Sequence, residues 1–241
     1  MPELITGGLG DPADRGDPDP RVTAALGAFA AGQGSEHAAL AALATARLLV
    51  PVVAVPAGAA PAGKTSEMAL PTLVGTDGRR ALLAFTGLPS LTAWRPHARP
   101  VPVTARQVWQ AGAEEANAVV IDIAGPVPFA VDGARLAALA GGHPAPLPHN
   151  DPDLQALAGA ALAGEPLIAW FALRPGSGGS DLTIQVALAP GYGPADARAQ
   201  AAIQRAVERI VTGGGGRVQR GITVAASAGD QPVRTPPGGG P

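Results

Sequence analysis

Glycine and proline divide this chain into short segments, and their placement limits the folds that it can adopt. The sequence holds 33 glycines and 26 prolines in 241 residues. Both interrupt regular elements, because ordering glycine costs much backbone entropy and proline lacks a backbone N–H. The strongest linker signal is HPAPLPHND at residues 143–151, where proline at every second position favours an extended chain. We therefore expect two small domains on either side of this linker.

The predicted domain boundaries follow from where periodic sequence begins and ends. Residues 1–18 and 229–241 are rich in glycine and proline and show no period, so we expect both to be disordered. The first domain is predicted over residues 19–142 and a smaller second domain over residues 152–228. Because helices and strands do not alternate strictly, the sequence favours an α+β fold, with a mixed or antiparallel sheet packed against helices in each domain.

The first predicted domain contains helices with recognisable N-terminal caps and strands rich in valine. A cap side chain accepts a hydrogen bond from the first backbone N–H groups of a helix, and an Asp-Gly turn joins hairpin strands. The predicted elements are helices after Asp19 and Ser35, a strand over 47–55 with an edge or bulge at Pro51, a hairpin over 68–74 and 80–86, a helix capped by Ser90, an extended segment over 100–103, a helix with a capping box of Thr104 and Gln107, strands over 118–123 and 127–131, and a helix from Asp132 to Gly141 and Gly142.

The second predicted domain is built from two helices and three strands. A helix begins after Asp151, and the most amphipathic helix runs from Pro194 to a glycine cap at Gly213. Strands are predicted over 167–173, 182–188 and 218–225, with a loose hairpin loop over 176–180. The alternation in 182–188 predicts a half-buried strand. We expect several charged side chains to face solvent: Arg205, Glu208, Arg209, Arg217 and Arg220.

Composition excludes several classes of chemistry. The chain has no cysteine, which rules out disulfides, thiolate nucleophiles and cysteine-ligated metals. A formal net charge of -2 argues against binding to a phosphate backbone. There is no signal-peptide pattern at the start, and no apolar run approaches the roughly 20 residues of a membrane helix. We therefore expect a cytoplasmic protein that binds neither nucleic acid nor a membrane.

One loop matches a phosphate-binding pattern. Residues 58–65 fit G-x-x-x-x-G-K-[ST] through Gly58, Gly63, Lys64 and Thr65. In a true P-loop the lysine reaches the β- and γ-phosphates, and the threonine hydroxyl holds Mg²⁺. Such a loop must also open a helix, whereas Pro71 and a hairpin follow at once here. We interpret it as a loop between strands and keep nucleotide binding as an alternative.

The histidines and acidic residues form no recognisable metal site. His143 and His149 with Asp151 and Asp153 offer nitrogen and oxygen ligands, but an extended linker does not make ligands converge. The early series of aspartates lacks the order and terminal glutamate of a calcium loop: Asp11, Asp14, Asp17 and Asp19. Neither His37 nor His97 has a neighbouring serine or acid in sequence that would indicate a catalytic triad. No metal is therefore assigned.

Asp122 is the other candidate for chemistry. It ends an apolar strand just before Gly125 and Pro126, where an aspartate commonly caps the following turn. A pocket that joined it with Glu67 and a histidine would instead indicate a hydrolase. The capping interpretation and the hydrolase alternative both stay open at this point.

The central part of the chain resembles the N-terminal domain of the bacterial SseB family, which is named for enhanced serine sensitivity. The resemblance covers roughly residues 22–141 and rests on Met68, the turn Asp77-Gly78-Arg79, Phe85 and Thr86, Trp94, and the strand end Asp122-Ile123-Ala124-Gly125-Pro126. The second half is similar to the C-terminal domain that often follows in this family. The resemblance implies an α+β fold and a cytosolic protein, and it implies no catalytic residue, substrate or cofactor.

We interpret the chain as a non-enzymatic protein-interaction or regulatory module. Its expected partner is an unidentified protein or a second copy of itself, and no catalytic residue or cofactor is assigned. The alternatives are a nucleotide-binding protein that uses residues 58–65 and a hydrolase built around Asp122.

Overall fold

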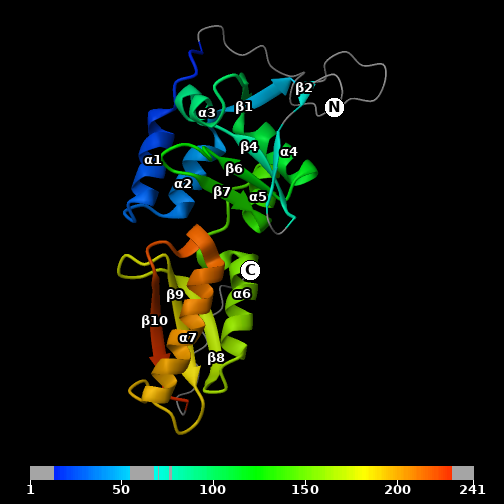
Figure 1. The fold of residues 1–241 in the computed structure, drawn as a ribbon. Coiled ribbons are helices and arrows are strands. Elements are labelled where there is room, and N and C mark those ends of the chain that lie inside the picture. Colours follow the sequence, from blue (N-terminus) through cyan, green and yellow to red (C-terminus); the bar gives the residue numbers. More distant parts are fainter. Residues whose placement is uncertain (1–13, 55–67, 70, 76–77, 230–241) are drawn as a thin grey trace, which may run out of the picture. The chain divides into compact units, whose positions relative to one another are not determined.

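The structure, a computed structural model, describes residues 14–54, 68–69, 71–75 and 78–229. The chain divides into two compact units, residues 1–146 and residues 147–241 (Figure 1). This division falls inside the predicted linker, although residues 148–150 form a short 3-10 helix instead of an extended chain. The phosphate-binding pattern at residues 58–65 lies outside the described residues.

The described part of the first unit interleaves helices with two sheets. Its helices are α1 (Pro20–Ala30), α2 (Glu36–Ala44), α3 (Leu88–Trp94), α4 (Ala105–Glu115) and α5 (Gly133–Ala140). Its strands are β1 (Arg47–Ala54), β2 (Met68–Ala69), β3 (Thr72–Val74), β4 (Arg80–Ala84), β5 (Arg99–Thr104), β6 (Ala118–Ile121) and β7 (Phe129–Asp132).

Three predicted helix caps are confirmed in this unit. The Asp19 carboxylate accepts a hydrogen bond from the second backbone N–H of α1, and the Ser35 hydroxyl accepts one within the first turn of α2. At α4 the capping box is complete: the Thr104 hydroxyl accepts from the Gln107 N–H, and the Gln107 side chain accepts from the Thr104 N–H. These caps satisfy N–H groups that have no partner inside the helix.

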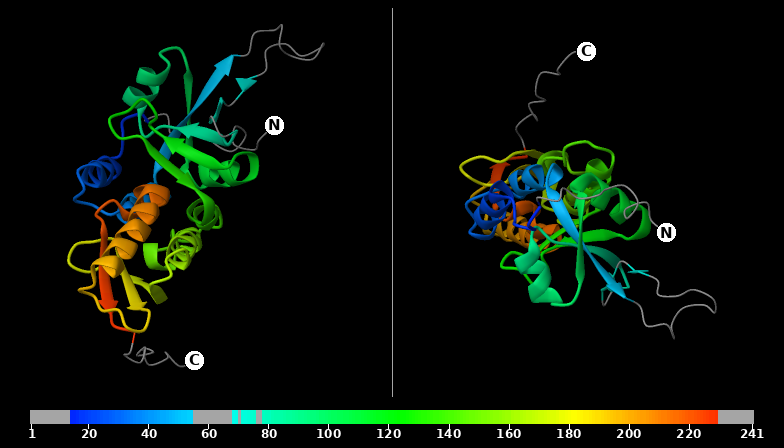
Figure 2. Two further views of the ribbon diagram at one scale, coloured as in Figure 1. Left: turned by 60° about the horizontal axis from the view of Figure 1, so that its bottom comes forward. Right: turned by 90° about the horizontal axis from the view of Figure 1, so that it is seen from above.

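The strands of the first unit form a sheet of order β2-β1-β5 and a sheet of order β3-β4-β6-β7. In the second of these, β4 and β6 are parallel, and the other pairs are antiparallel. Leu49 in β1 and Phe85 after β4 exchange backbone hydrogen bonds of 2.8 Å, which join the two sheets. Figure 2 shows β1, in light blue, extending beyond β4 and β6 toward the end that pairs with β2.

Strand alternation divides the first unit into two hydrophobic clusters. Leu82 and Ala84 of β4 point into the larger cluster, which α1, α2, α4 and α5 cover and which contains Trp109. Leu83 and Phe85 point to the opposite face, into a smaller cluster under α3. Successive side chains of a strand face opposite ways, so a strand that is buried on both faces reads as a continuous apolar run.

Several local predictions for this unit are corrected by the structure. Met68 and Ala69 pair with β1, so only residues 72–74 form the hairpin with β4. Helix α3 begins at Leu88 after Gly87, which places Ser90 inside the helix instead of at its cap. Asp132 precedes α5 without a capping hydrogen bond, because its carboxylate pairs with Arg135.

The end of the predicted disordered leader is held in place. The Arg47 guanidinium pairs with the Asp14 carboxylate at 2.9 Å and donates to the Asp17 carbonyl at 2.5 Å. The Leu88 N–H also donates to the Gly16 carbonyl at 2.8 Å. Residues 14–18 are therefore part of the first unit, and the prediction that they are disordered is wrong.

The second unit is a three-stranded sheet with helices on one face. Its elements are α6 (Pro152–Ala163), β8 (Ile168–Pro175), β9 (Leu182–Leu188), α7 (Ala197–Gly214) and β10 (Ile222–Ser227). The sheet order is β10-β9-β8, with β9 parallel to β10 and antiparallel to β8. Leu182, Ile184 and Val186 of β9 pack in one cluster with residues of α6 and α7. Both helices therefore cover the same face of this sheet (Figure 1).

Some predictions for the second unit also change. Every residue of β9 except Gln185 is buried: Leu182, Ile184 and Val186 pack against the helices, and the alternate positions carry the small side chains of Thr183 and Ala187. Helix α7 begins after Asp196, which caps it, and it ends before Gly215 at a φ of 57°. Both units nevertheless combine helices with mixed or antiparallel sheets, so the chain is an α+β protein as predicted. None of the helices in the described part of the chain has the length and hydrophobicity required to cross a bilayer.

Candidate functional site

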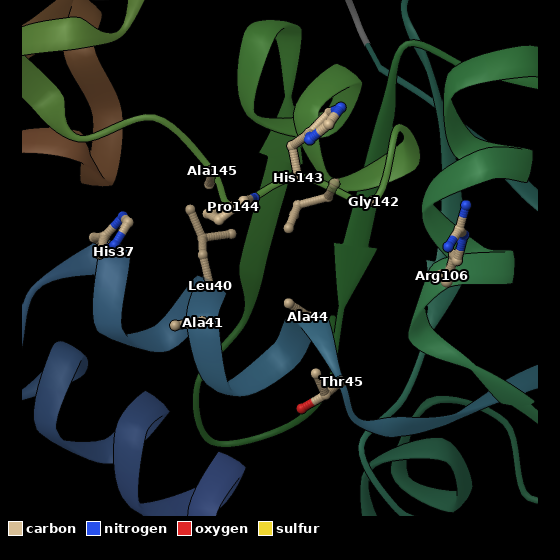
Figure 3. Close-up of a pocket in the computed structure, with 11 residues that line it drawn as sticks. His37, Leu40, Ala41, Ala44, Thr45, Arg106, Gly142, His143, Pro144 and Ala145 are labelled. Carbon is tan, nitrogen blue, oxygen red and sulfur yellow. The ribbon is translucent and has the colours of Figure 1, made fainter.

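A cavity of about 390 Å³ in the first unit is the main candidate site. It lies where α2, the first turn of α4 and the end of α5 meet, and residues 143–145 complete its lining (Figure 3). Its volume is within the range of pockets that hold small molecules. The lining residues are His37, Leu40, Ala41, Ala44, Thr45, Arg106, Leu139, Gly142, His143, Pro144 and Ala145.

The cavity exists because small side chains stand where larger ones would fill the space. Ala41 and Ala44 lie beside Leu40 on α2, and alanine has only a methyl group to offer. The hollow opens to solvent, because Ala41, Thr45, Arg106 and residues 142–144 of its lining are exposed. The alanine-rich sequence of α2 thus produces both the helix and the hollow beside it.

The turn after α5 brings His143 to the cavity. The His143 N–H donates to the Ala138 carbonyl at 2.9 Å, and the Gly142 N–H donates to the Leu139 carbonyl at 3.0 Å. Gly142 adopts a φ of 78°, the left-handed conformation that glycine allows in this type of helix end. The glycines that were predicted to end this helix therefore also position a lining histidine.

The polar lining of the cavity is basic. Figure 3 shows His37 and Arg106 on opposite sides of Leu40 and Ala44, with His143 near the Gly142 turn. The capping box at the start of α4 orients the turn that carries Arg106. The Nδ1 atom of His37 is buried and has no hydrogen-bond partner in the described part of the chain. No lining residue is an aspartate or a glutamate.

Asp122 occupies a separate position at the carboxyl ends of the parallel strands β4 and β6. Its carboxylate accepts two hydrogen bonds from Thr86, from the backbone N–H at 2.9 Å and from the hydroxyl at 2.6 Å. The Ser90 side chain also lies near it and favours its charged form. Burial raises the pKa of Asp122 above its ordinary value, and these hydrogen bonds offset part of that shift.

The backbone around Asp122 forms a tight turn. Asp122 has a φ of 50°, and its carbonyl accepts from the Gly125 N–H at 2.7 Å. A Cβ atom on Gly125 would lie 2.9 Å from both the Asp122 Cβ and the Ser90 Oγ. An added Cβ would therefore clash at this position, which favours glycine. The Asp122 backbone carbonyl closes the turn, whereas its carboxylate binds Thr86 on the neighbouring strand end instead of capping the turn as predicted. The side chain is only 4% exposed, which leaves little access for a substrate.

The other residues singled out in the sequence are dispersed or lie outside the described residues. Glu67 lies outside, as do Gly58, Gly63, Lys64 and Thr65 of the phosphate-binding pattern. Asp151 caps α6 and pairs with Arg217, and Asp153 also lies next to Arg217. Within the described residues, no three histidine, aspartate or glutamate side chains are close enough together to hold a metal ion.

Arg217 and Arg220 of the second unit were predicted to face solvent, but each binds a buried aspartate. The Arg217 Nε is 3.0 Å from the Asp151 carboxylate, and that arginine side chain is 12% exposed. The Arg220 side chain and backbone N–H both bind the buried Asp181 carboxylate. These pairs join residues that are distant in sequence, so composition and periodicity contain no signal for them.

Glu165 forms a third charged cluster in the second unit. Its buried carboxylate binds Arg205 and Arg209 of α7 at 2.7 Å each. The hydrogen bond from Arg205, followed by that from Arg209, lowers the pKa of Glu165 below its ordinary value. Both arginine side chains are about half exposed, which agrees with the polar face predicted for α7. The cluster connects α7 to the segment that follows α6, and the Glu165 carboxylate is fully engaged by these two arginines.

The fold and the cavity define an α+β protein whose first unit can accommodate a small molecule. Residues 22–138 match the family model of the SseB protein N-terminal domain. This match lies within the first unit and is to the family that the sequence motifs predicted. No curated protein and no solved structure matches the chain.

The cavity itself was missed by reasoning from the sequence. Arg106 was not singled out, and His37 and His143 were considered only as possible triad or metal residues. They lie far apart in the sequence, and only packing of α2, α4 and α5 brings them to one cavity. Gly141 and Gly142 indicated that the chain turns after α5, but nothing in the sequence indicated that this turn lines a cavity.

Proposed function

We propose that this protein is a non-enzymatic interaction or regulatory module whose first unit binds a small molecule in the cavity between α2, α4 and α5. The composition of the lining supports this proposal most directly. It combines an apolar floor with basic side chains, and none of its residues is a carboxylate. A histidine that acts as a general base is usually oriented by a carboxylate, and neither lining histidine has one within the cavity.

The environment of Asp122 supports a binding function over a hydrolytic one. Both carboxylate oxygens already accept hydrogen bonds from Thr86, and the side chain is almost fully buried. A catalytic carboxylate needs to reach a substrate or a water molecule. Asp122 is instead well placed to hold the ends of two parallel strands together.

The position of the cavity suggests how binding could be regulatory. Residues 143–145 line it and lead directly to the boundary between the two units at residues 146 and 147. A ligand that contacts this segment would restrain its conformational freedom. Ligands shift an equilibrium by binding one conformation better than another, so occupancy of the cavity could alter how the chain presents itself to a protein partner.

The proposal can be tested by mapping ligand contacts on the full-length protein. A set of small acids, amides, alcohols and amines would be added to the ¹⁵N-labelled chain, and the amide signals followed. We expect signals of α2, the start of α4 and residues 139–145 to shift. An Ala44→Leu variant, which fills the cavity, should abolish the shifts, whereas Ala24→Leu on the exposed side of α1 should not.

The same samples test the absence of catalysis. The proton spectra of the added compounds should remain unchanged after prolonged incubation with the protein. Formation of products that Ala44→Leu prevents would contradict a non-enzymatic function. Failure of every compound to shift the cavity signals of the folded wild-type chain would contradict binding at this site.

A further inference from the structure

We infer that the ligand of this cavity is a small monocarboxylate with a short apolar chain and no ammonium group. The inference rests on the proposed binding function and specifies the class of ligand. Two properties of the lining carry it: an arginine without a carboxylate partner in the described part of the chain, and an apolar floor without acidic residues.

Arg106 supplies the recognition of a carboxylate. Its guanidinium lies against the Gly142 backbone, where an added Cβ would be 3.4 Å from the Arg106 Cζ. Within the described part of the chain it has no acidic partner, in contrast to Arg205 and Arg217, whose partners are Glu165 and Asp151. The planar guanidinium presents paired donors that match the two oxygens of a carboxylate.

The apolar lining determines the remainder of the ligand. Leu40, Ala44, Leu139 and Ala145 provide a hydrophobic surface in a cavity of about 390 Å³. A short aliphatic chain would cover this surface and gain free energy from its removal from water. Arg106 is the only lining residue with a permanent charge. A single permanent positive charge suits a monoanion better than phosphate, which carries close to two negative charges.

The absence of acidic lining residues predicts discrimination against amino acids. The ammonium group of an α-amino acid would enter a site whose charged groups are all basic. The ammonium group would be repelled by the Arg106 guanidinium, and no carboxylate in the lining offsets that repulsion, so this arrangement selects against such ligands. Simple carboxylates should therefore bind better than amino acids of the same chain length.

Titration of the full-length chain with four probes tests this inference. The probes are pentanoate, pentanamide, 2-aminopentanoate and inorganic phosphate, with cavity amide signals as the readout. We expect the Kd of pentanoate to be at least about tenfold lower than that of each other probe, as loss of one charge-assisted contact would produce. Arg106→Gln should weaken pentanoate binding by about tenfold or more, and Arg106→Lys should weaken it less.

Arg99→Gln is the matched control, because it removes one exposed arginine charge from the same unit without touching the cavity. It should leave the pentanoate Kd unchanged. Equal binding of pentanoate and pentanamide at the cavity, or an unchanged Kd in Arg106→Gln, would overturn the carboxylate inference while leaving a binding cavity. Absence of pentanoate binding would overturn the inference as well. The proposed function itself would fail only if no compound of the wider set bound there.

Discussion

Thr86 binds both carboxylate oxygens of Asp122, with its backbone N–H 2.9 Å from Oδ1 and its hydroxyl 2.6 Å from Oδ2. The contact joins the ends of the parallel strands β4 and β6. Thr86, Asp122 and Gly125 all belong to the motifs by which the chain resembles the SseB family. Trp94, another motif residue, stacks near Phe85 with ring centroids 5.6 Å apart. These motif residues therefore support the fold of the first unit.

Removing the Thr86 hydroxyl should destabilise the first unit. In Thr86→Val the Asp122 oxygen loses its donor while remaining buried, which costs about 1–3 kcal/mol of unfolding free energy. Thr86→Ser keeps the hydroxyl, so its unfolding free energy should fall by less than that of Thr86→Val. Urea denaturation of the full-length variants measures the effect. Equal stability of the valine and serine variants would show that the Thr86 hydroxyl hydrogen bond does not contribute to the stability of the first unit.

Asp122 should make stability fall as pH rises. Its pKa is raised in the folded chain, so the folded state holds this proton more tightly than the unfolded state. The resulting stabilisation is complete below the unfolded value of about 3.9 and is lost as pH increases through the folded value. We therefore expect the unfolding free energy of the wild type, relative to Asp122→Asn, to decrease from acidic to neutral pH. A constant difference across that range would contradict the raised pKa.

Glu165 should have the opposite pH dependence. Its pKa is lowered by Arg205 and Arg209, so its contribution is present above the unfolded value of about 4.3 and is lost as pH falls through the lower folded value. Glu165→Gln should be less stable than the wild type near neutral pH, by about 1 kcal/mol or less, because both arginines are half exposed. The two proteins should become equally stable in acid. Urea unfolding at several pH values provides the comparison.

Two helical glycines should respond to alanine in opposite directions. A Cβ at Gly112 in α4 would lie 2.3 Å from the Val119 Cγ2 of β6, so Gly112→Ala should cost about 1–3 kcal/mol through overpacking. A Cβ at Gly27 in α1 meets no atom within 4 Å, so Gly27→Ala should stabilise by about 0.5–1 kcal/mol. Thermal unfolding of both variants checks the signs. Stabilisation by Gly112→Ala would mean that α4 is not packed this closely on β6.

Local features of the fold could be predicted because their causes lie within a few residues. The caps at Asp19, Ser35 and Asp151, and the box of Thr104 with Gln107, follow from hydrogen bonds to the nearest backbone N–H groups. Most strands follow from short apolar runs between breakers. The family resemblance was visible for a similar reason, since its motifs are continuous stretches of sequence.

By itself, the sequence determined the α+β class, most helix starts and the absence of cysteine chemistry, since these depend on residue type and short-range spacing. Only the tertiary structure decided that Met68 pairs with β1, that Arg217 and Arg220 bind buried aspartates, and that His37, Arg106 and His143 share a cavity. Each of these depends on contacts between residues far apart in the chain. Such contacts are set by how whole helices and sheets pack, and periodicity carries no information about which side chains then meet.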